Sequence, residues 1–256
     1  MGKSERVRSG IGVVTVLLAL AGCGGAAREH GVAGAQKAIV KRCAAGFERP
    51  LGSPASAWAA VVIRPTAAYR EPGRRRLARF GVLNVNGVPT VLGVLGEQLD
   101  GNCRATWLHV ALPIRPNGST GWVRASDVER WLVRTLITVD LSEKRVRLFE
   151  RGRLVLSSRA AIGSSATPTP VGRYYVNQRL IPGDPTGPFG PGAVGISAFS
   201  PVLTGWAQGG PIAIHGTNEP WSIGRAVSNG CIRIPNPALR RLFAQALAGT
   251  PVVIRR

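Results

Sequence analysis

Residues His215–Asn236 read HGTNEPWSIGRAVSNGCIRIPN and place one histidine and one cysteine 16 residues apart, each beside small residues that favour turns. A free thiol has a pKa of about 8.5 and is only slightly ionised at neutral pH, but a neighbouring imidazole can accept its proton and leave a nucleophilic thiolate. Gly230 lets the backbone approach a substrate carbonyl, and N–H groups near Gly230 and Cys231 are suited to hold an oxyanion. These residue types therefore suffice for acyl transfer through a thioester.

Spacing alone leaves two other interpretations of this histidine and cysteine open. Both residues can be purely structural, or they can be ligands of a zinc ion. A closed tetrahedral zinc site needs four ligands, and this stretch offers only His215 and Cys231, with no CxxC or HxxxH pattern. We therefore expect no metal and no cofactor.

The sequence around this stretch predicts a mainly β unit over residues 131–256. A short apolar or alternating run is typical of a strand, and such runs occupy Leu136–Asp140, Lys144–Phe149, Leu154–Ser157, Val171–Val176, Pro211–His215 and Pro251–Ile254. Asn236–Ala248 predicts the single helix, with Asn236 as its N-cap and Pro237 at the first helical position. Gly183–Gly195 is rich in Gly and Pro and predicts a mobile flap.

Two motifs in this unit resemble those of a known family. His215-Gly216-Thr217 followed by Ser228-Asn229-Gly230-Cys231-Ile232-Arg233 resembles the signature of the L,D-transpeptidases with a YkuD-type catalytic domain. Thr167–Val176 (TPTPVGRYYV) and Leu136–Val155 also resemble segments of that family. The resemblance spans about 120 residues and implies a β-sandwich-like catalytic domain with one C-terminal helix.

The resemblance also implies roles for individual residues. Cys231 is the expected nucleophile and His215 the expected base, with the Gly216 carbonyl orienting the imidazole. Ser228, Asn229 and Gly230 are expected to shape the turn and the oxyanion site, while Arg233 either anchors the motif or binds a carboxylate. Many members carry histidine where this chain has Asn229, so His215 is left as the sole candidate base.

Residues 57–130 predict a small β-barrel. Turn clusters separate the expected strands, which are Ala59–Ile63, Arg79–Leu83, Thr90–Val94, Thr106–Leu112 and Gly121–Arg124. The stretch Trp107–Val128 resembles bacterial SH3-like domains found beside cell-wall enzymes. We expect Trp107 and Trp122 to lie in its core and His109 to be a structural residue of a strand.

The N-terminus predicts export. Lys3, Arg6 and Arg8 precede the eleven-residue apolar run Ile11–Ala21, which fits the hydrophobic region of a signal peptide over residues 1–22. Leu20-Ala21-Gly22-Cys23 resembles the bacterial lipobox, in which the cysteine receives a lipid. Residues 23–56 are then a tether.

Four cysteines are present, and Cys23 is assigned to lipid. An odd number remains, so at least one is unpaired within the chain. Cys43 and Cys103 are able to pair, and the sequence leaves open whether they do.

The chain carries 33 basic and 13 acidic residues among 256, a formal charge of +20. Such a charge favours polyanionic surroundings, and export makes nucleic acid an unexpected partner. The lipobox resemblance implies a membrane-anchored lipoprotein of the cell envelope. The L,D-transpeptidase resemblance implies an enzyme that joins third-position diamino acids of peptidoglycan stem peptides through a cysteine thioester. We expect the protein to be a monomer. The alternatives are an L,D-carboxypeptidase and a non-catalytic, wall-binding lipoprotein.

Overall fold

The computed structural model describes residues 42–53 and 56–256. The predicted signal peptide, the Cys23 lipidation site and most of the predicted tether lie outside these residues. Within the described ranges, no helix is long and apolar enough to cross a bilayer.

The N-terminal half forms one sheet in the order β4-β3-β7-β6-β5-β2-β8, with β1 paired to β5. Its strands are β1 Phe47–Pro50, β2 Ala57–Val62, β3 Thr66–Glu71, β4 Arg74–Phe80, β5 Val91–Leu99, β6 Ala105–Ala111, β7 Thr120–Arg124 and β8 Val128–Val133, with the 3₁₀ turn η1 at Ala125–Asp127. Leu92, Leu108 and Val123 are fully buried between these strands. Trp122 is 9% exposed and the His109 ring stacks on it at 4.9 Å, so Trp122 lies in the core as expected and His109 packs against it. The same expectation for Trp107 is wrong, because Trp107 is partly exposed and Arg124 lies over its ring at 4.9 Å.

The strands of this half differ from their predictions in several places, and β4 is the clearest case. The expected strand Arg79–Leu83 is wrong in its bounds, because β4 begins at Arg74 and ends at Phe80. β4 lies at the edge of the sheet, and its first four residues are exposed. An edge strand does not need an apolar face, and charged side chains protect it from pairing with other chains. The apolar pattern therefore gives no signal over Arg74–Arg76.

Cys43 and Cys103 form a disulfide across a separation of 60 residues, which confirms the pairing left open by the sequence. Cys43 precedes β1, and Cys103 lies in the turn between β5 and β6. Among the described residues, Cys231 is the free cysteine.

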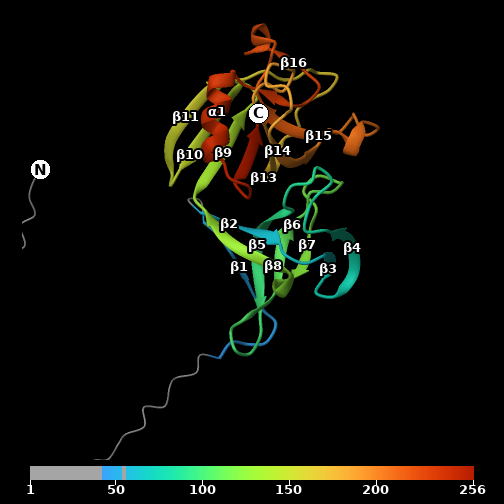
Figure 1. Cartoon of the computed structure of the whole chain (residues 1–256). Coiled ribbons are helices and arrows are strands. Elements are labelled where there is room, and N and C mark those ends of the chain that lie inside the picture. Colours follow the sequence, from blue (N-terminus) through green and yellow to red (C-terminus); the bar gives the residue numbers. More distant parts are fainter. Residues whose placement is uncertain (1–41, 54–55) are drawn as a thin grey trace, which may run out of the picture. The chain divides into compact units, whose positions relative to one another are not determined.

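The C-terminal half forms a second sheet in the order β11-β10-β9-β18-β13-β14-β15-β17, and β12 and β16 form a separate two-stranded pair. Figure 1 labels six strands of this sheet (β9, β10, β11, β13, β14 and β15) together with helix α1. Its elements are β9 Thr135–Asp140, β10 Arg145–Glu150, β11 Arg153–Arg159, β12 Ile162–Gly163, β13 Gly172–Leu180, β14 Ala193–Phe199, η2 Ala207–Gly209, β15 Pro211–His215, η3 Pro220–Ser222, β16 Ala226–Ser228, β17 Ile232–Arg233, α1 Asn236–Gln245 and β18 Pro251–Arg255. The mainly β fold class, with one α-helix among the described residues, is confirmed.

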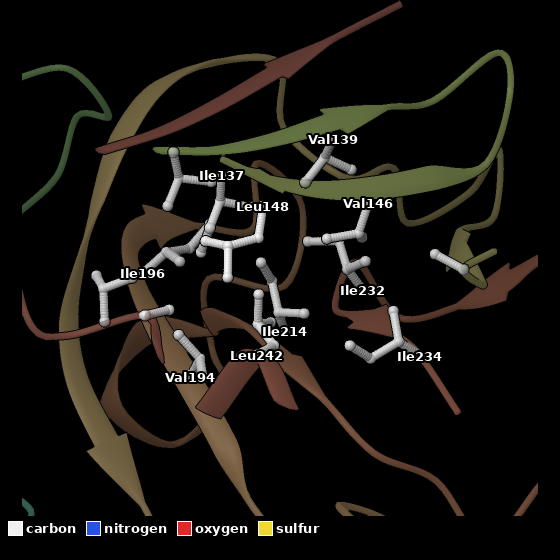
Figure 2. Close-up of a cluster of buried hydrophobic side chains, with 14 of the residues drawn as sticks. Ile137, Val139, Val146, Leu148, Val194, Ile196, Ile214, Ile232, Ile234 and Leu242 are labelled. Atoms are coloured by element: carbon white, nitrogen blue, oxygen red, sulfur yellow. The ribbon is translucent and has the colours of Figure 1, made fainter. Parts of the chain in front are cut away.

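Helix α1 closes the core of this half. Leu239 and Leu242 of α1 are fully buried, and Figure 2 shows Leu242 in one cluster with Ile214 of β15 and Ile232 of β17. Burying a leucine side chain stabilises a fold by about 1.5–3 kcal/mol. The core under α1 therefore fixes β15, which ends at the histidine described below, and β17, which begins directly after the cysteine described below.

Two expectations for this half are corrected. The loop predicted over Gly183–Gly195 ends earlier, because β14 begins at Ala193 and pairs that residue with His215. The helix ends at Gln245 rather than Ala248, and Pro235 rather than Asn236 occupies its N-cap. Asn236 is the first residue of the helix, and its side chain makes a different contact, described below.

Candidate active site

The sheet itself brings the candidate residues to one face. β15 and β17 are parallel neighbours in the register Ile214↔Ile232 and His215↔Arg233. Successive side chains of a strand alternate between faces, and paired residues share a face. Since Ile214 and Ile232 point into the core, the opposite face carries His215, Cys231 and Arg233. The structure thus gathers three residues that the sequence spacing alone could not place together.

His215 is 4% exposed and lies at the end of β15. Its Nδ1–H donates a hydrogen bond to the Gly216 carbonyl oxygen at 2.6 Å. This bond fixes the tautomer and leaves Nε2 as the nitrogen with a free lone pair. Burial lowers the pKa of His215 to about 4, because the imidazolium form loses its hydration, and the nearby Arg233 charge lowers it further.

Cys231 is partly exposed and precedes β17. Its Sγ lies 3.9 Å from the Pro211 carbonyl oxygen, to which the thiol donates. Burial raises the pKa of Cys231, and this effect outweighs the opposing effects of a hydrogen bond to the Ala213 backbone and of the Arg233 charge. The resting site therefore holds a neutral thiol beside a neutral imidazole.

The turn before Cys231 is held by Ser228. The Ser228 hydroxyl, 2% exposed as a residue, donates to the Cys231 carbonyl at 2.6 Å and accepts from the Gly230 N–H at 3.2 Å. Gly230 has φ +110°, a conformation that residues with a Cβ rarely adopt. Asn229 is exposed at the tip of this turn.

Two threonines that the sequence analysis did not assign to the site brace the same turn. Thr167 Oγ1 donates to the Ser228 carbonyl at 2.9 Å, and Thr169 Oγ1 donates to the Gly230 carbonyl at 2.8 Å. Thr169 also accepts from the Gly163 N–H at 2.9 Å. The TPTP motif was the available signal, since two hydroxyls at alternating positions between prolines point to one side of an extended segment.

Asn236 supports the segment that follows the histidine. Its Oδ1 accepts from the Thr217 N–H at 2.8 Å. A Cβ added at Gly216 would lie 2.3 Å from this oxygen, and one added at Gly190 would lie 2.4 Å from it. Only glycine therefore fits at these two positions, and the HGT motif owes its glycine to this contact.

The Gly183–Gly192 part of the predicted flap reaches the base. The Phe189 ring lies 4.9 Å from the His215 ring, although Phe189 is 48% exposed. Asp184 organises the loop by accepting from the Thr186 N–H at 2.8 Å and from its hydroxyl at 2.6 Å. Sequence analysis identified the loop but not Phe189 as its contact with the site.

Arg233 is held by an ion pair with Glu219, to which its Nη1 donates. The Arg233 backbone also exchanges two hydrogen bonds with Ala161, at 2.8 and 2.9 Å. Of the two roles considered for Arg233, the resting structure shows a carboxylate of the protein itself as its partner. Glu219 was not singled out by the sequence, because a single acidic residue in a loop carries no pattern.

Metal-ligating side chains do not gather at this site. Among residues 42–53 and 56–256, there is no cluster of three or more His, Cys, Asp or Glu side chains arranged to hold a metal ion.

Residues 134–254 match the family model described as the L,D-transpeptidase catalytic domain, YkuD. The chain is 40% identical over 118 residues to the YkuD protein of Bacillus licheniformis, which is named as an L,D-transpeptidase; the match covers 46% of this chain and 64% of that protein. The YkuD protein of Bacillus subtilis is 37% identical over 120 residues, covering 47% and 65%. The chain thus spans just under two thirds of the length of these relatives.

Solved structures are also similar. The Bdellovibrio bacteriovorus Bd1075 structure is 26% identical, with a TM-score of 0.39, over 48% of this chain and 47% of that one. The catalytic domain of an Enterococcus faecium L,D-transpeptidase is 24% identical, with a TM-score of 0.36, over 47% of this chain and 96% of that one.

Proposed function

Because residues 134–254 form an L,D-transpeptidase catalytic domain of the YkuD type, we propose that this protein cross-links peptidoglycan through a thioester on Cys231. Its donor is a stem tetrapeptide, and its product joins the third-position diamino acids of two neighbouring stems. The observation that carries the proposal is the placement of the His215 imidazole, with its Nδ1–H fixed on the Gly216 carbonyl, on the sheet face shared with the Cys231 thiol.

The first step forms the acyl-enzyme. His215 Nε2 takes the thiol proton as the Cys231 sulfur attacks the carbonyl at the L-centre of the third residue. The tetrahedral intermediate then collapses, the bond to D-alanine breaks, and His215 returns the proton to the leaving amine. A thioester and free D-alanine result, and the imidazole is neutral again.

The second step transfers the acyl group. The side-chain amine of a second stem attacks the thioester, and the C–S bond breaks. His215 takes the proton of the amine and gives it to the departing sulfur, which restores the thiol. One amide bond has replaced another, so the cycle needs no external energy source.

The oxyanion of both intermediates needs a positioned donor. The Gly230 N–H is used inside the turn by Ser228, so the proposal assigns the oxyanion to the N–H of Cys231. Ser228 contributes indirectly, since its bond to the Cys231 carbonyl orients this residue.

The neutral resting pair suits this chemistry. A free thiolate would react with oxidants outside the cell, whereas a neutral thiol becomes nucleophilic only as Nε2 removes its proton. In the resting structure the thiol points at the Pro211 carbonyl. Acylation therefore begins with a rotation of the Cys231 side chain from Pro211 toward His215.

Disaccharide tetrapeptides test the proposal. The full chain, purified in detergent, is incubated with this substrate, and the products are analysed by mass spectrometry. We expect a dimer that has lost one D-alanine. The Cys231→Ala variant should form none, while Val227→Ala, a matched substitution at an exposed neighbour of the turn, should retain activity.

Other products would change the conclusion. Loss of one D-alanine without a dimer makes the protein an L,D-carboxypeptidase with water as acceptor. If no product forms and a carbapenem leaves no covalent adduct on Cys231, the thiol is not an acylable nucleophile, and the wall-binding alternative replaces the enzyme.

The choice between amine and water is assigned to the 183–192 loop. The Phe189 ring lies 4.9 Å from the His215 ring, and its proposed role is to keep water away from this imidazole during the second step. Replacing Phe189 with Ala should raise the ratio of hydrolysis to cross-linking, measured as free tripeptide against dimer. An unchanged ratio would remove the loop from acceptor selection.

The proposal places the protein at the outer face of a membrane, anchored by lipid on Cys23, as a monomer. Radiolabelled palmitate should be incorporated into the wild-type chain and not into Cys23→Ser. Equal labelling of both would exclude Cys23 as the lipidation site.

A further inference from the structure

A cleft of about 380 Å³ is lined by the segment between β4 and β5 and by β13, β14 and the start of β15. Its lining is unusual for this chain. The sequence holds thirteen Asn and Gln residues, and five of them line this one cleft. These five are Asn84, Asn86, Asn177, Gln178 and Gln208.

Four of the five carboxamides form a fixed wall. Gln178 Oε1 accepts from Asn84 Nδ2 at 2.9 Å and from Asn86 Nδ2 at 2.8 Å. Gln208 Nε2 donates to Asn86 Oδ1 at 2.8 Å. Because these side chains hold one another, the polar groups at the wall keep their orientation before any ligand arrives, which lowers the entropic cost of binding.

Two polar atoms at the same cleft lack partners. Among the described residues, three buried side-chain polar atoms have no hydrogen-bond partner, and two of them, Thr90 Oγ1 and Asn177 Oδ1, belong to residues that line this cleft. Thr90 is only 5% exposed. A buried polar group without a partner costs about 1–3 kcal/mol of stability. Each such group in a folded protein calls for an explanation, and contact with a ligand is one of them.

One residue that lines the cleft also contacts the candidate nucleophile. Pro211 lines the cleft, and its carbonyl oxygen is the hydrogen-bond acceptor of the Cys231 thiol. Pro211 is therefore shared by the cleft and by the surroundings of the candidate nucleophile.

We propose that this cleft binds the glycan portion of the donor strand, an N-acetylated disaccharide, while its stem peptide extends to Cys231. The inference rests on the proposed function for the identity of the strand. Carboxamides and a threonine hydroxyl offer donors and acceptors without charge, which matches the hydroxyl and acetamido groups of an uncharged sugar. Phe80 and Phe199 supply the apolar walls.

The charge of the lining argues against the stem peptide as occupant. A stem peptide carries free carboxylates, which are bound most strongly by arginine or lysine. Arg79 is the one charged residue that lines the cleft. The sugar is therefore favoured over the peptide.

Binding is tested without turnover. The disaccharide of N-acetylglucosamine and N-acetylmuramic acid, with its lactoyl group amidated to remove the charge, is titrated into the full chain in detergent by calorimetry. Thr90→Val and Asn177→Ala should each weaken binding about three- to tenfold. Thr106→Val and Asn102→Ala, matched substitutions at exposed residues outside the cleft, should leave binding unchanged.

Thermal unfolding separates a ligand role from a structural one. Thr90→Val removes a buried hydroxyl that has no partner, so its melting temperature should stay equal or rise while its affinity for the disaccharide falls. A weaker affinity accompanied by a matching loss of stability would overturn the proposal, because the hydroxyl would then act through the fold.

Kinetics distinguish this proposal from the proposed function. The wild-type kcat/KM should be at least about tenfold higher for disaccharide tetrapeptide than for the sugar-free tetrapeptide, and Asn177→Ala should reduce this ratio. If both substrates are turned over equally and the disaccharide does not bind, the glycan-binding role of the cleft is wrong and the proposed enzymatic function stands. If the disaccharide binds and neither substrate is turned over, the glycan-binding role stands and the proposed enzymatic function is wrong. Competition by the sugar-free tetrapeptide at the cleft would assign it to the peptide instead.

Discussion

Burial sets the protonation state of both candidate catalytic side chains. It lowers the pKa of His215 to about 4 and raises the pKa of Cys231, so the two effects act in the same direction on proton transfer. Both favour the neutral pair over the ion pair. The ion pair is therefore higher in free energy in the resting site. During attack on the substrate, fixed dipoles stabilise the developing charge and offset this difference.

The first prediction concerns the pH dependence of activity. His215 accepts a proton only when it is neutral, and its lowered pKa keeps it neutral down to about pH 4. We therefore expect kcat/KM for disaccharide tetrapeptide to stay constant from pH 7 to about pH 5 and to fall only near pH 4. A decline already centred near pH 6.5, the ordinary histidine value, would contradict the burial described here.

The second prediction concerns stability in acid. The unfolded chain binds a proton at His215 below about pH 6.5, whereas the folded chain does so only near pH 4. Protons therefore favour the unfolded state in this window, and the stability present above pH 6.5 is lost as the pH falls toward 4. The loss amounts to about 3 kcal/mol. Urea unfolding of wild type and His215→Asn across this range measures it, and the variant should lose correspondingly less.

At the residue scale the sequence predicted a candidate pair, His215 and Cys231, but not the residues that hold the two in place. His215, Gly216, Ser228 and Cys231 stand in one motif and were assigned together. Thr169 lies about 60 residues earlier, and its contact with the turn depends on how distant segments fold together. Asn236 was predicted as a cap because asparagine at a helix start usually is one. Its oxygen instead accepts from Thr217, a contact that local sequence does not encode.

The strand that follows the candidate nucleophile is short, and contacts from other segments hold it in place. β17 has two residues, and the turn before it is held by Ser228 and by the Thr167–Pro170 segment. A two-residue strand contributes few hydrogen bonds of its own. Its position is therefore determined by its parallel partner β15 and by these threonines.

The third prediction tests this bracing. Thr169→Val removes a hydroxyl that joins the Gly163 N–H to the Gly230 carbonyl in a buried position. Leaving these groups unpaired should lower the free energy of unfolding by about 1–3 kcal/mol. The variant should also have a lower kcat, because the turn before Cys231 would be held less firmly. Thr169→Ser keeps the hydroxyl and should retain most activity.

Thr204→Val is the matched control for this prediction, since Thr204 is exposed. Normal kcat in Thr169→Val together with the expected loss of stability would show that the threonine supports the fold without positioning the turn.

At the element scale the sequence located strands best where they are buried on one face. Arg145–Glu150 alternates, and it forms β10 almost as predicted. β14 was not predicted, because its first residues, Ala193–Gly195, continue a Gly- and Pro-rich loop in the sequence. Its seven residues are nearly all buried between β13 and β15, so alternation is absent and composition misleads.

The N-terminal and C-terminal halves are connected by the polypeptide chain and also pack against each other. Tyr175 of β13 donates to the Val91 carbonyl of β5 at 3.2 Å. A Cβ at Gly249 would lie 2.1 Å from the Ala59 side chain, so the segment after α1 closely approaches β2. No sequence pattern indicated this contact, because each partner is an ordinary core residue of its own half.

The fourth prediction concerns the disulfide. Closing a loop of this length is expected to stabilise the fold by about 4 kcal/mol through the entropy of the unfolded chain. The double variant Cys43→Ala, Cys103→Ala should lose stability in guanidinium unfolding by up to this amount, while Cys231 stays intact. Equal midpoints for wild type and variant would mean that the cross-link does not constrain the unfolded chain.

This cross-link also decides how the molecule carries mechanical load. Cys43 precedes β1, a four-residue exposed strand that pairs with β5 and is joined to it by the Arg49–Glu97 ion pair, whereas Cys103 lies in the turn after β5. A pull on the chain upstream of Cys43 passes through the covalent S–S bond into the β5–β6 hairpin and bypasses β1. Tension applied to the chain upstream of Cys43 would therefore act on β5 and β6 before it could peel the first strand away.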